Sequence, residues 1–221
     1  IDIGVGDNAI GLTSLNGLTG PNLIDGNNII GAGRFGIEIK NPAGAVTVSN
    51  NTIALSSPPN DTRDRAGIAV FRRGFLPGQG YVEIPNGVTI SNNTVSNVKQ
   101  SSASDGFGIV VEGTNHIISN NNLNNNDIGI QQQAGHTPYT AGAAVDGDQS
   151  NLSDLYFGRG NSPELCNITL NGNLFSGNLV NERIVVGGGL GTIVPTVAPN
   201  ANINAPFAVW QNSIGNVVSV P

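Results

Sequence analysis

The sequence predicts an all-β solenoid, a fold in which short strands recur along the chain and stack on one another. Three observations indicate this: a recurring six-residue pattern, a short Gly-Ile pattern that alternates with it, and apolar runs that are only of strand length. No segment shows the i, i+3, i+4, i+7 spacing of an amphipathic helix, so we expect few helices. The alternative is a β-sandwich with asparagine-rich turns, because sandwiches also contain short, closely spaced strands.

The six-residue pattern reads apolar, any residue, Asn/Gly/Asp, Asn, any residue, apolar. Its copies are residues 5–10, 24–29, 48–53, 90–95, 118–123 and 170–175, and the residues at the fourth place are Asn8, Asn27, Asn51, Asn93, Asn121 and Asn173. A stacked asparagine can donate its amide to the next asparagine and can adopt a left-handed turn conformation. We therefore predict that these six side chains form one hydrogen-bonded ladder.

The second pattern is Gly-Ile-x-apolar. It occurs at residues 36–39, 67–70 and 108–111, with a polar variant at residues 129–132. Strand alternation directs the isoleucines inward and predicts a mixed outer surface, formed by Glu38, Ala69, Val110 and Gln131 in one row and by Lys40, Phe71, Glu112 and Gln133 in the next. Gln132 stands where an apolar residue is expected, so we predict a local departure from the core there.

The spacing of the ladder asparagines indicates one repeat of roughly 20–28 residues. Successive ladder positions are 19, 24, 42, 28 and 52 residues apart, and the two long intervals are either double repeats or repeats with insertions. Stacked repeats would pair like strands in parallel, at about 4.8 Å from one another.

The Val-x-Asn-Asn-Thr-Ile and Gly-Ile-x-Val units resemble the repeats of the right-handed parallel β-helix family. This broad family includes pectate lyases, polygalacturonases, mannuronan epimerases and nitrous-oxide-reductase accessory proteins of the NosD type. The resemblance covers roughly residues 5–186. It implies an all-β, right-handed parallel β-helix of about seven or eight coils over residues 1–186. Residues 187–221 are expected to form an irregular extended segment that caps or flanks the same domain.

Four insertions interrupt the repeats, and such loops tend to carry function. They span residues 56–66, 71–86, 97–105 and about 133–163. Arginine binds uronate carboxylates in a bidentate manner, and aromatic side chains stack on sugar rings. The residues predicted to bind polysaccharide are therefore Arg63, Arg65, Arg72, Arg73, Phe75, Tyr81, His136 and Tyr139. The alternative for the arginines is a solvated loop that neutralises its own charge.

The fourth insertion also contains a partial calcium-loop pattern. Its candidate metal ligands, at places 1, 3, 5 and 9 of such a loop, are Asp146, Asp148, Ser150 and Asp154. The pattern departs from a calcium loop because Asn151 replaces the glycine and Phe157 replaces the final bidentate glutamate. Ca²⁺ is thus the one cofactor that the sequence suggests, against an ordinary Asp/Ser/Gly loop.

Charge excludes some classes of partner. The chain has 9 Lys and Arg residues against 15 Asp and Glu residues, a net charge of −6. This diffuse acidic balance argues against a nucleic-acid partner, and without a long apolar run or a basic cluster we expect no membrane insertion. The epimerase-type Asp-Pro-His motif and the Asp-Asp pair of polygalacturonases are absent from the sequence.

We therefore expect a secreted, non-catalytic module at a cell surface or in an extracellular matrix, which is structural and self-associating or binds polysaccharide. No amphipathic capping helix precedes the first repeat, so an open strand edge is expected there. Its expected partners are polysaccharide or like subunits that stack end to end into a filament. The alternative is a lyase, hydrolase or epimerase acting on a uronate-containing glycan, with His136 and Tyr139 as an acid–base pair.

Overall fold

The all-β class is confirmed by a computed structural model. It describes residues 8–18, 21–55, 65–71, 85–100, 106–134, 164–186, 192–194, 200, 207–211 and 217–220. Every regular element within these ranges is a β-strand, and the pairings between successive repeats are parallel. The same ranges contain no helix that is long and apolar enough to cross a membrane.

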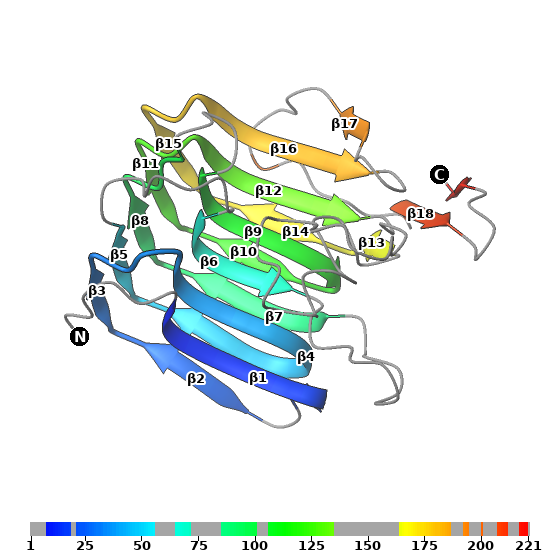
Figure 1. The fold of residues 1–221 in the computed structure, drawn as a ribbon, viewed down its shortest axis with the longest axis horizontal. Helices are drawn as coiled ribbons and strands as arrows, with labels where there is room; N and C mark the ends of the chain where they lie inside the picture. Colours follow the sequence, from blue (N-terminus) through cyan, green and yellow to red (C-terminus); the bar gives the residue numbers. More distant parts are fainter. Residues whose placement is uncertain are drawn as a thin grey trace, which may run out of the picture.

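Most strands belong to three parallel stacks (Figure 1). The long stack contains β1 (Asn8–Leu18), β4 (Phe35–Ser49), β6 (Arg65–Phe71), β9 (Gly106–Thr114), β12 (Ile128–Ala134) and β16 (Val180–Val186). The middle stack contains β2 (Asn22–Asp25), the second half of β4, β7 (Asn86–Ser91), β10 (Ile117–Ser119) and β14 (Thr169–Asn171). The short stack contains β3 (Asn28–Ile30), β5 (Thr52–Ala54), β8 (Thr94–Ser96), β11 (Asn122–Asn124) and β15 (Leu174–Ser176).

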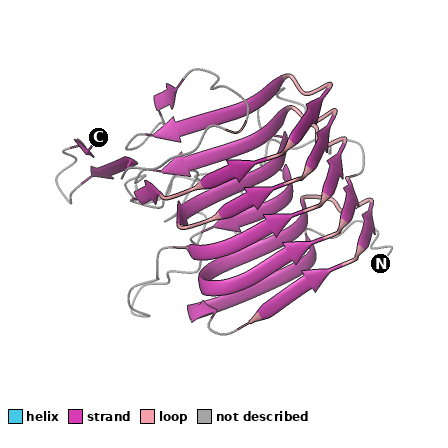
Figure 2. Cartoon of the chain, turned by 180° about the vertical axis from the view of Figure 1, so that it is seen from behind, coloured by secondary structure: helices cyan, strands magenta, loops and turns pink. Residues whose placement is uncertain are grey.

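The chain visits the long, middle and short stacks in the same order in each repeat. Figure 2 shows the resulting tiers of parallel strands from behind, with short loops between them. The remaining strands lie towards the C-terminal end of the stacks. β13 (Glu164–Cys166) pairs with β9 and with β18 (Phe207–Gln211), β17 (Thr192–Val194) is antiparallel to β16, and β19 (Val217–Val220) is antiparallel to β18.

One apolar core lies between the three stacks, and both sequence patterns contribute to it. The isoleucines of the Gly-Ile pattern are opposite one another in adjacent long strands and are fully buried; they are Ile37, Ile68, Ile109 and Ile130. The apolar places of the six-residue pattern are buried in the middle and short stacks, as in Val48 and Ile53. The inward positions predicted from alternation are thus confirmed.

The glycine of the Gly-Ile pattern is required by the close approach of successive long strands. A Cβ atom on Gly67 would lie 2.1 Å from Cγ1 of Val95 and 2.8 Å from the carbonyl oxygen of Gly108. A Cβ atom on Gly129 would lie 2.5 Å from the carbonyl oxygen of Asn181. Only glycine fits where another backbone approaches so closely.

The outer face of the long stack differs from the prediction of a mixed exposed surface. Glu38, Ala69, Val110 and Gln131 are all buried, as are the next-row residues Phe71, Glu112 and Gln133. Apolar members of this face form a second cluster, in which the Phe35 and Phe71 rings lie edge to face with their centroids 5.7 Å apart. The prediction was wrong because alternation separates the two faces of a strand but does not say whether the second face is covered, and parallel sheets are commonly buried on both faces.

The predicted departure from the core at Gln132 is also wrong. Gln132 pairs in register with Val111 on one side and Ile184 on the other, and it is fully buried. Among the described residues, neither polar atom of its side chain has a hydrogen-bond partner. The strand keeps its register through its pairing with β9 and β16. On the opposite face, Nε2 of Gln131 donates to Oε1 of Gln133 at 2.5 Å.

Candidate functional site

Of the residues predicted to bind polysaccharide, the structure describes one, Arg65. The other seven lie outside the described residues: Arg63, Arg72, Arg73, Phe75, Tyr81, His136 and Tyr139. The four candidate calcium ligands lie outside them as well: Asp146, Asp148, Ser150 and Asp154. Within the part of the chain that is described, no three His, Cys, Asp or Glu side chains gather as a metal site would require.

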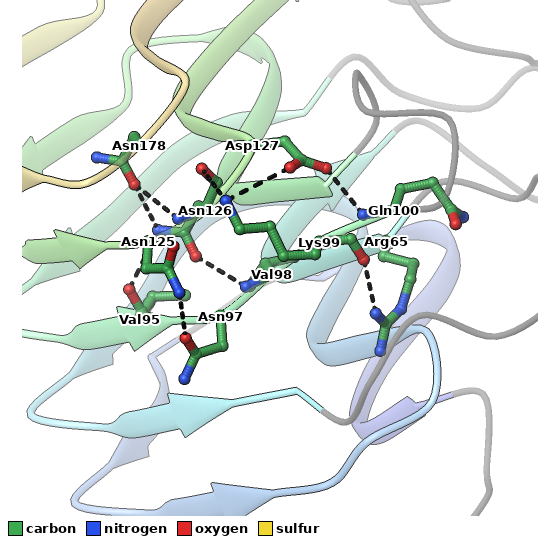
Figure 3. Close-up of polar contacts among 10 residues, drawn as sticks. All are labelled: Arg65, Val95, Asn97, Val98, Lys99, Gln100, Asn125, Asn126, Asp127 and Asn178. Carbon is green, nitrogen blue, oxygen red and sulfur yellow. Dashed lines mark hydrogen bonds and ion pairs between the residues drawn. The ribbon is translucent and has the colours of Figure 1, made fainter.

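Arg65 is a buried structural residue that links neighbouring repeats, rather than a ligand-binding side chain. It opens β6 and is fully buried. Its guanidinium donates from Nε to the Gly33 carbonyl at 2.8 Å. Nη1 donates to the Lys99 carbonyl at 2.7 Å (Figure 3). These carbonyls belong to neighbouring repeats, so Arg65 joins three of them. We therefore correct its assignment to a glycan groove, since a buried guanidinium that is held by carbonyls is not presented to a uronate.

The same corner of the molecule, where the short stack leads into the long stack, contains an ion pair (Figure 3). Nζ of Lys99 lies 3.6 Å from Oδ1 of Asp127 and donates to the Asn126 carbonyl at 3.1 Å. Oδ2 of Asp127 accepts the backbone N–H of Gln100 at 2.8 Å. The contact connects two successive repeats. Sequence reasoning missed it because no motif links residues that are so far apart in the chain.

Five of the six predicted ladder residues form one continuous row, which we call the asparagine ladder: Asn27, Asn51, Asn93, Asn121 and Asn173. Each donates its side-chain amide to Oδ1 of the next, at 2.9 Å. The same Oδ1 also accepts the backbone N–H of the preceding ladder residue, at 2.9–3.0 Å. The ladder prediction is confirmed for these five residues.

The ladder differs from the prediction at both ends. Asn8 is not a member: it starts β1 opposite Phe35, and its amide donates to Oε2 of Glu38 at 2.6 Å. At the other end the ladder continues to Asn200, whose Oδ1 accepts both the backbone N–H and the amide of Asn173. Asn200 was missed because the sequence around it departs from the pattern at two places: Pro199 stands at the third place and Asn202 at the sixth, which should be apolar.

Each internal ladder asparagine also bonds to the preceding repeat. Nδ2 of Asn51 donates to the Ile24 carbonyl, and Nδ2 of Asn121 to the Ile90 carbonyl, both at 3.0 Å. One side chain therefore contacts the repeats before and after its own, while it is buried. A buried amide whose partners are all present stabilises the fold, whereas removing it leaves several polar groups unpaired.

A shorter second row lies at the next turn. Oδ1 of Asn126 accepts the backbone N–H of Val98 at 3.0 Å, and Oδ1 of Asn178 accepts both the backbone N–H and the amide of Asn126 at 2.9 and 3.1 Å. The geometry matches that of the asparagine ladder. The sequence did not reveal this row because the equivalent residue one repeat earlier is Val98, which has no side-chain amide.

A chain of hydrogen bonds crosses the buried outer face of the long stack. Nε of Arg183 donates to Gln131 at 2.5 Å, Gln131 donates to Gln133 at 2.5 Å, and Gln133 donates to Oε1 of Glu112 at 2.8 Å. Arg183 also lies over the Phe107 ring, 5.8 Å from its centroid. The Arg183 guanidinium and the Glu112 carboxylate are thus linked through the side-chain amides of Gln131 and Gln133. Their polar groups are hydrogen-bonded within the protein.

His116 is a second buried group that has a structural role. Its Nδ1 accepts the backbone N–H of Val88 at 3.1 Å, and its Nε2 lies 2.9 Å from the Glu112 carbonyl, to which a neutral ring donates. Burial lowers the pKa of His116 to about 4. The imidazole is therefore neutral at pH 7, with its proton on Nε2.

The outer faces of the middle and short stacks are polar and carry side chains in register from one repeat to the next. In the middle stack the two rows are Leu23, Thr47, Thr89, Ile117 and Thr169, and Asp25, Ser49, Ser91, Ser119 and Asn171. In the short stack they are Asn28, Thr52, Thr94, Asn122 and Leu174, and Ile30, Ala54, Ser96, Asn124 and Ser176. We call these four rows the polar face. Hydroxyl and amide groups predominate in it, and Asp25 is its one charged residue.

Comparisons with protein-family models, with curated proteins and with solved structures find no match to this chain.

Proposed function

We propose that the chain is a right-handed parallel β-helix, in which each circuit through the long, middle and short stacks is one coil. Support comes from the constant order in which the chain visits the stacks and from the parallel pairing of equivalent strands. The asparagine ladder adds to this support, because one side chain repeats its contacts from coil to coil.

On this scaffold the function that the geometry supports best is that of a non-catalytic module, secreted to a cell surface or matrix, which binds a neutral polysaccharide. One observation carries the proposal: the polar face repeats hydroxyl and amide groups in register over successive coils. Equivalent side chains lie about 4.8 Å apart in such a stack. A periodic array of neutral donors and acceptors suits a ligand that is itself periodic and rich in hydroxyl groups.

Three basic side chains are engaged inside the protein, which favours binding by the neutral polar face over catalysis by charged groups. Arg65 is held by backbone carbonyls, Lys99 by Asp127, and Lys40 by Glu38, whose Oε2 lies 3.4 Å from its Nζ. Exposed apolar side chains in the polar face, Ile117 and Leu174, offer contacts to the CH groups of sugar rings. The face therefore combines the polar and apolar contacts that a sugar chain requires, with little charge.

The test is a binding assay with a triple variant, Thr47→Val, Thr89→Val and Thr169→Val. Valine keeps the β-branched shape and strand preference of threonine but removes three hydroxyls from one row. We expect the wild-type chain to co-sediment with insoluble neutral polysaccharide such as cellulose or chitin, and the triple variant to bind at least about tenfold more weakly.

The matched control is the double variant Asn115→Gly and Asn167→Gly. Both asparagines are exposed, lie outside the polar face and have positive φ angles, 56° and 52°, which glycine accepts. Binding should be unchanged in this variant. Absence of binding by the wild-type chain, or equal binding by the triple variant, would contradict the proposal.

The alternative function, an enzyme acting on a uronate-containing glycan, is supported by one feature, the Glu112 and Arg183 pair on the long stack. Its groups are joined to each other through Gln131 and Gln133, which weakens this support. Incubation with alginate and pectin discriminates between the two functions. New ultraviolet absorbance from unsaturated products, or new reducing ends, would establish the enzyme and displace the binding module.

A further inference from the structure

Three asparagines in the chain are followed directly by glycine: Asn16, Asn86 and Asn171. Such a pair is chemically reactive, because the backbone nitrogen of the glycine can attack Cγ of the asparagine and no side chain shields that nitrogen. Folding slows the reaction where the asparagine side chain is held or covered. Asn16 lies in β1 with its side chain outside the described residues, so the structure compares Asn86 with Asn171.

The side chain of Asn171 is both exposed and unrestrained. Asn171 ends β14, and it and Gly172 are exposed. Among the described residues no hydrogen bond engages the Asn171 side chain, while its backbone carbonyl accepts the N–H of Asn120 at 2.9 Å. The turn also requires its glycine, because Gly172 has a φ of 64° and a Cβ atom on it would lie 2.3 Å from Oδ1 of Asn120. The fold therefore places the reactive pair on the surface and fixes the glycine in it.

The side chain of Asn86 is restrained. Asn86 begins β7, and both it and Gly87 are half-buried. Oδ1 of Asn86 accepts the side-chain amide of Asn115 at 2.9 Å. This hydrogen bond must break before Cγ can rotate towards the nitrogen of Gly87. The same dipeptide is thus protected at one corner of the molecule and unprotected at another.

The turn after Asn171 has a counterpart that contains a carboxylate. Strand register places Asp25 and Asn171 in one row of the polar face, with serines between them at positions 49, 91 and 119. A glycine with positive φ follows each of the two, Gly26 at 66° and Gly172 at 64°. An aspartate at position 171 would repeat the Asp-Gly-Asn sequence that already forms this turn in the first repeat. The fold accepts the acid in place of the amide.

We propose that Asn171 is a site of spontaneous deamidation in the folded protein. The backbone nitrogen of Gly172 attacks Cγ of Asn171 and forms a bond to it. The Cγ–Nδ2 bond breaks, and the amino group leaves as ammonia with the proton of the Gly172 N–H. Water then opens the resulting succinimide ring. Addition at Cγ gives aspartate, whereas addition at the backbone carbonyl carbon gives isoaspartate, in which the main chain continues through Cγ.

Both products change the end of the polar face. Either product adds a carboxylate to a face in which Asp25 is the one charged residue. Isoaspartate also lengthens the backbone by one carbon shortly before Asn173, whose Oδ1 accepts the backbone N–H and the amide of Asn121. The asparagine ladder is then displaced at this member. Conversion requires no polysaccharide, so the inference stands independently of the proposed function.

The test follows the two peptides that contain Asn86 and Asn171. The full chain is kept folded at mildly alkaline pH, digested at acidic pH, where the reaction is slow, and analysed by mass spectrometry. We expect the Asn171 peptide to convert to a mixture of isoaspartate and aspartate at least about tenfold faster than the Asn86 peptide, because burial and a hydrogen bond restrain Asn86. In the urea-unfolded chain the two peptides should convert at similar rates.

Two variants provide the controls. Asn171→Ser places at this position the residue of the three preceding repeats, so it should abolish isoaspartate there and leave conversion of Asn86 unchanged. Asn171→Asp carries the new charge on a normal backbone, and the isoaspartate fraction of the aged wild type, separated by ion exchange, should have a lower thermal midpoint than this variant. Equal midpoints would contradict displacement of the ladder.

Two results would overturn the site itself. The first is conversion of Asn171 that is equal to or slower than that of Asn86 in the folded chain, because the structure would then not select the site. The second is aspartate at Asn171 without isoaspartate, because direct hydrolysis of the amide would then replace attack by the Gly172 nitrogen.

Discussion

The two ends of the asparagine ladder are closed to different degrees. At the C-terminal end Asn173 donates to Asn200, and Asn200 donates to the buried carboxylate of Glu182. At the N-terminal end Oδ1 of Asn27 accepts no hydrogen bond within the described residues, and the apolar side chains of Leu23 and Ile30 are exposed beside it. Among the described residues, the ladder therefore ends in donors that are hydrogen-bonded on one side and in an acceptor that receives no hydrogen bond on the other.

This difference follows from the direction of the hydrogen bonds rather than from the quality of the strands. A directional ladder collects donors at one end and acceptors at the other, so no single cap closes both. A carboxylate closes the donor end because it only accepts. An acceptor end can be closed only by N–H or O–H donors.

The largest effect is expected from Arg65→Met, which tests how firmly the N-terminal coils are attached. Arg65 joins Gly33, in the first turn into β4, to Lys99 two coils further on. Losing charge-assisted bonds to buried carbonyls should lower the free energy of unfolding by roughly 3–5 kcal/mol. Urea unfolding measures the total, and hydrogen exchange should rise more in β2 and β3 than in β14 and β15. Equal increases at both ends would contradict a local role.

Acidification should destabilise the folded protein without changing the difference between the two ends of the asparagine ladder. The pKa of His116 has its ordinary value of 6.5 in the unfolded chain, and burial lowers this pKa to about 4 in the folded protein. The unfolded chain therefore binds the extra proton first, and the free energy of unfolding should fall by about 3 kcal/mol as the pH drops from 6.5 to 4. The contribution is complete above pH 6.5.

Urea midpoints measured between pH 7.5 and pH 4 test this dependence on His116. The control variant, His116→Asn, has no titrating ring and should lose most of the slope between pH 6.5 and pH 5. A slope in the variant equal to that of the wild type would show that another group is responsible.

Replacing single ladder asparagines sharpens the comparison directly. Asn121→Ala removes the acceptor of the Asn93 backbone N–H and one of the acceptors of the Asn93 amide, which keeps the Val48 carbonyl, and it also removes the donor to the Ile90 carbonyl, all in a buried site; about 3 kcal/mol is expected. Asn27→Ala removes a half-buried side chain whose Oδ1 accepts nothing from the described residues, so about 1 kcal/mol is expected. Chemical unfolding of the two variants gives the difference, and equal losses would refute the idea that the N-terminal member is less engaged.

The smallest effect is expected at the closed end. Glu182→Gln retains a side-chain oxygen that can accept the Asn200 N–H, so the loss should stay below about 1 kcal/mol. Glu182→Ala removes the acceptor and should cost about 1–2 kcal/mol more. The comparison of these two variants by urea unfolding separates the acceptor from the charge. A larger loss for glutamine than for alanine would exclude the proposed closure.

Much of the repeat architecture was readable from the sequence, because each coil uses the same side chains for the same contacts. The apolar places of Ile37, Ile68 and Ile109 and five ladder asparagines followed from spacing alone. Asn8 was misassigned because its flanking residues match the pattern, while its strand register places it at the start of β1. The sequence pattern shows which side-chain types follow one another, but it does not show whether they lie in a strand or in the turn between two strands.

Features that depend on contacts between distant segments were not readable. Alternation placed Glu112 and Gln133 on an outer face, but burial of that face depends on other parts of the chain. Arg65 was predicted to be a ligand-binding residue because arginine-rich loops often are, and its carbonyl partners around Gly33 and Lys99 become neighbours only after folding. Both cases concern polar groups whose partners have no fixed spacing in the sequence.

Native-state hydrogen exchange at the two ends of the ladder tests the central claim most directly. The measurement compares the backbone amides of Asn27 and Asn173, each of which donates to the next asparagine, at 2.9 and 3.0 Å respectively. The C-terminal end of the ladder is hydrogen-bonded to Glu182, whereas the Oδ1 of Asn27 accepts no hydrogen bond from the described residues, so we predict slower exchange at Asn173 than at Asn27. Faster exchange at Asn173, or equal rates at the two residues, would contradict the account.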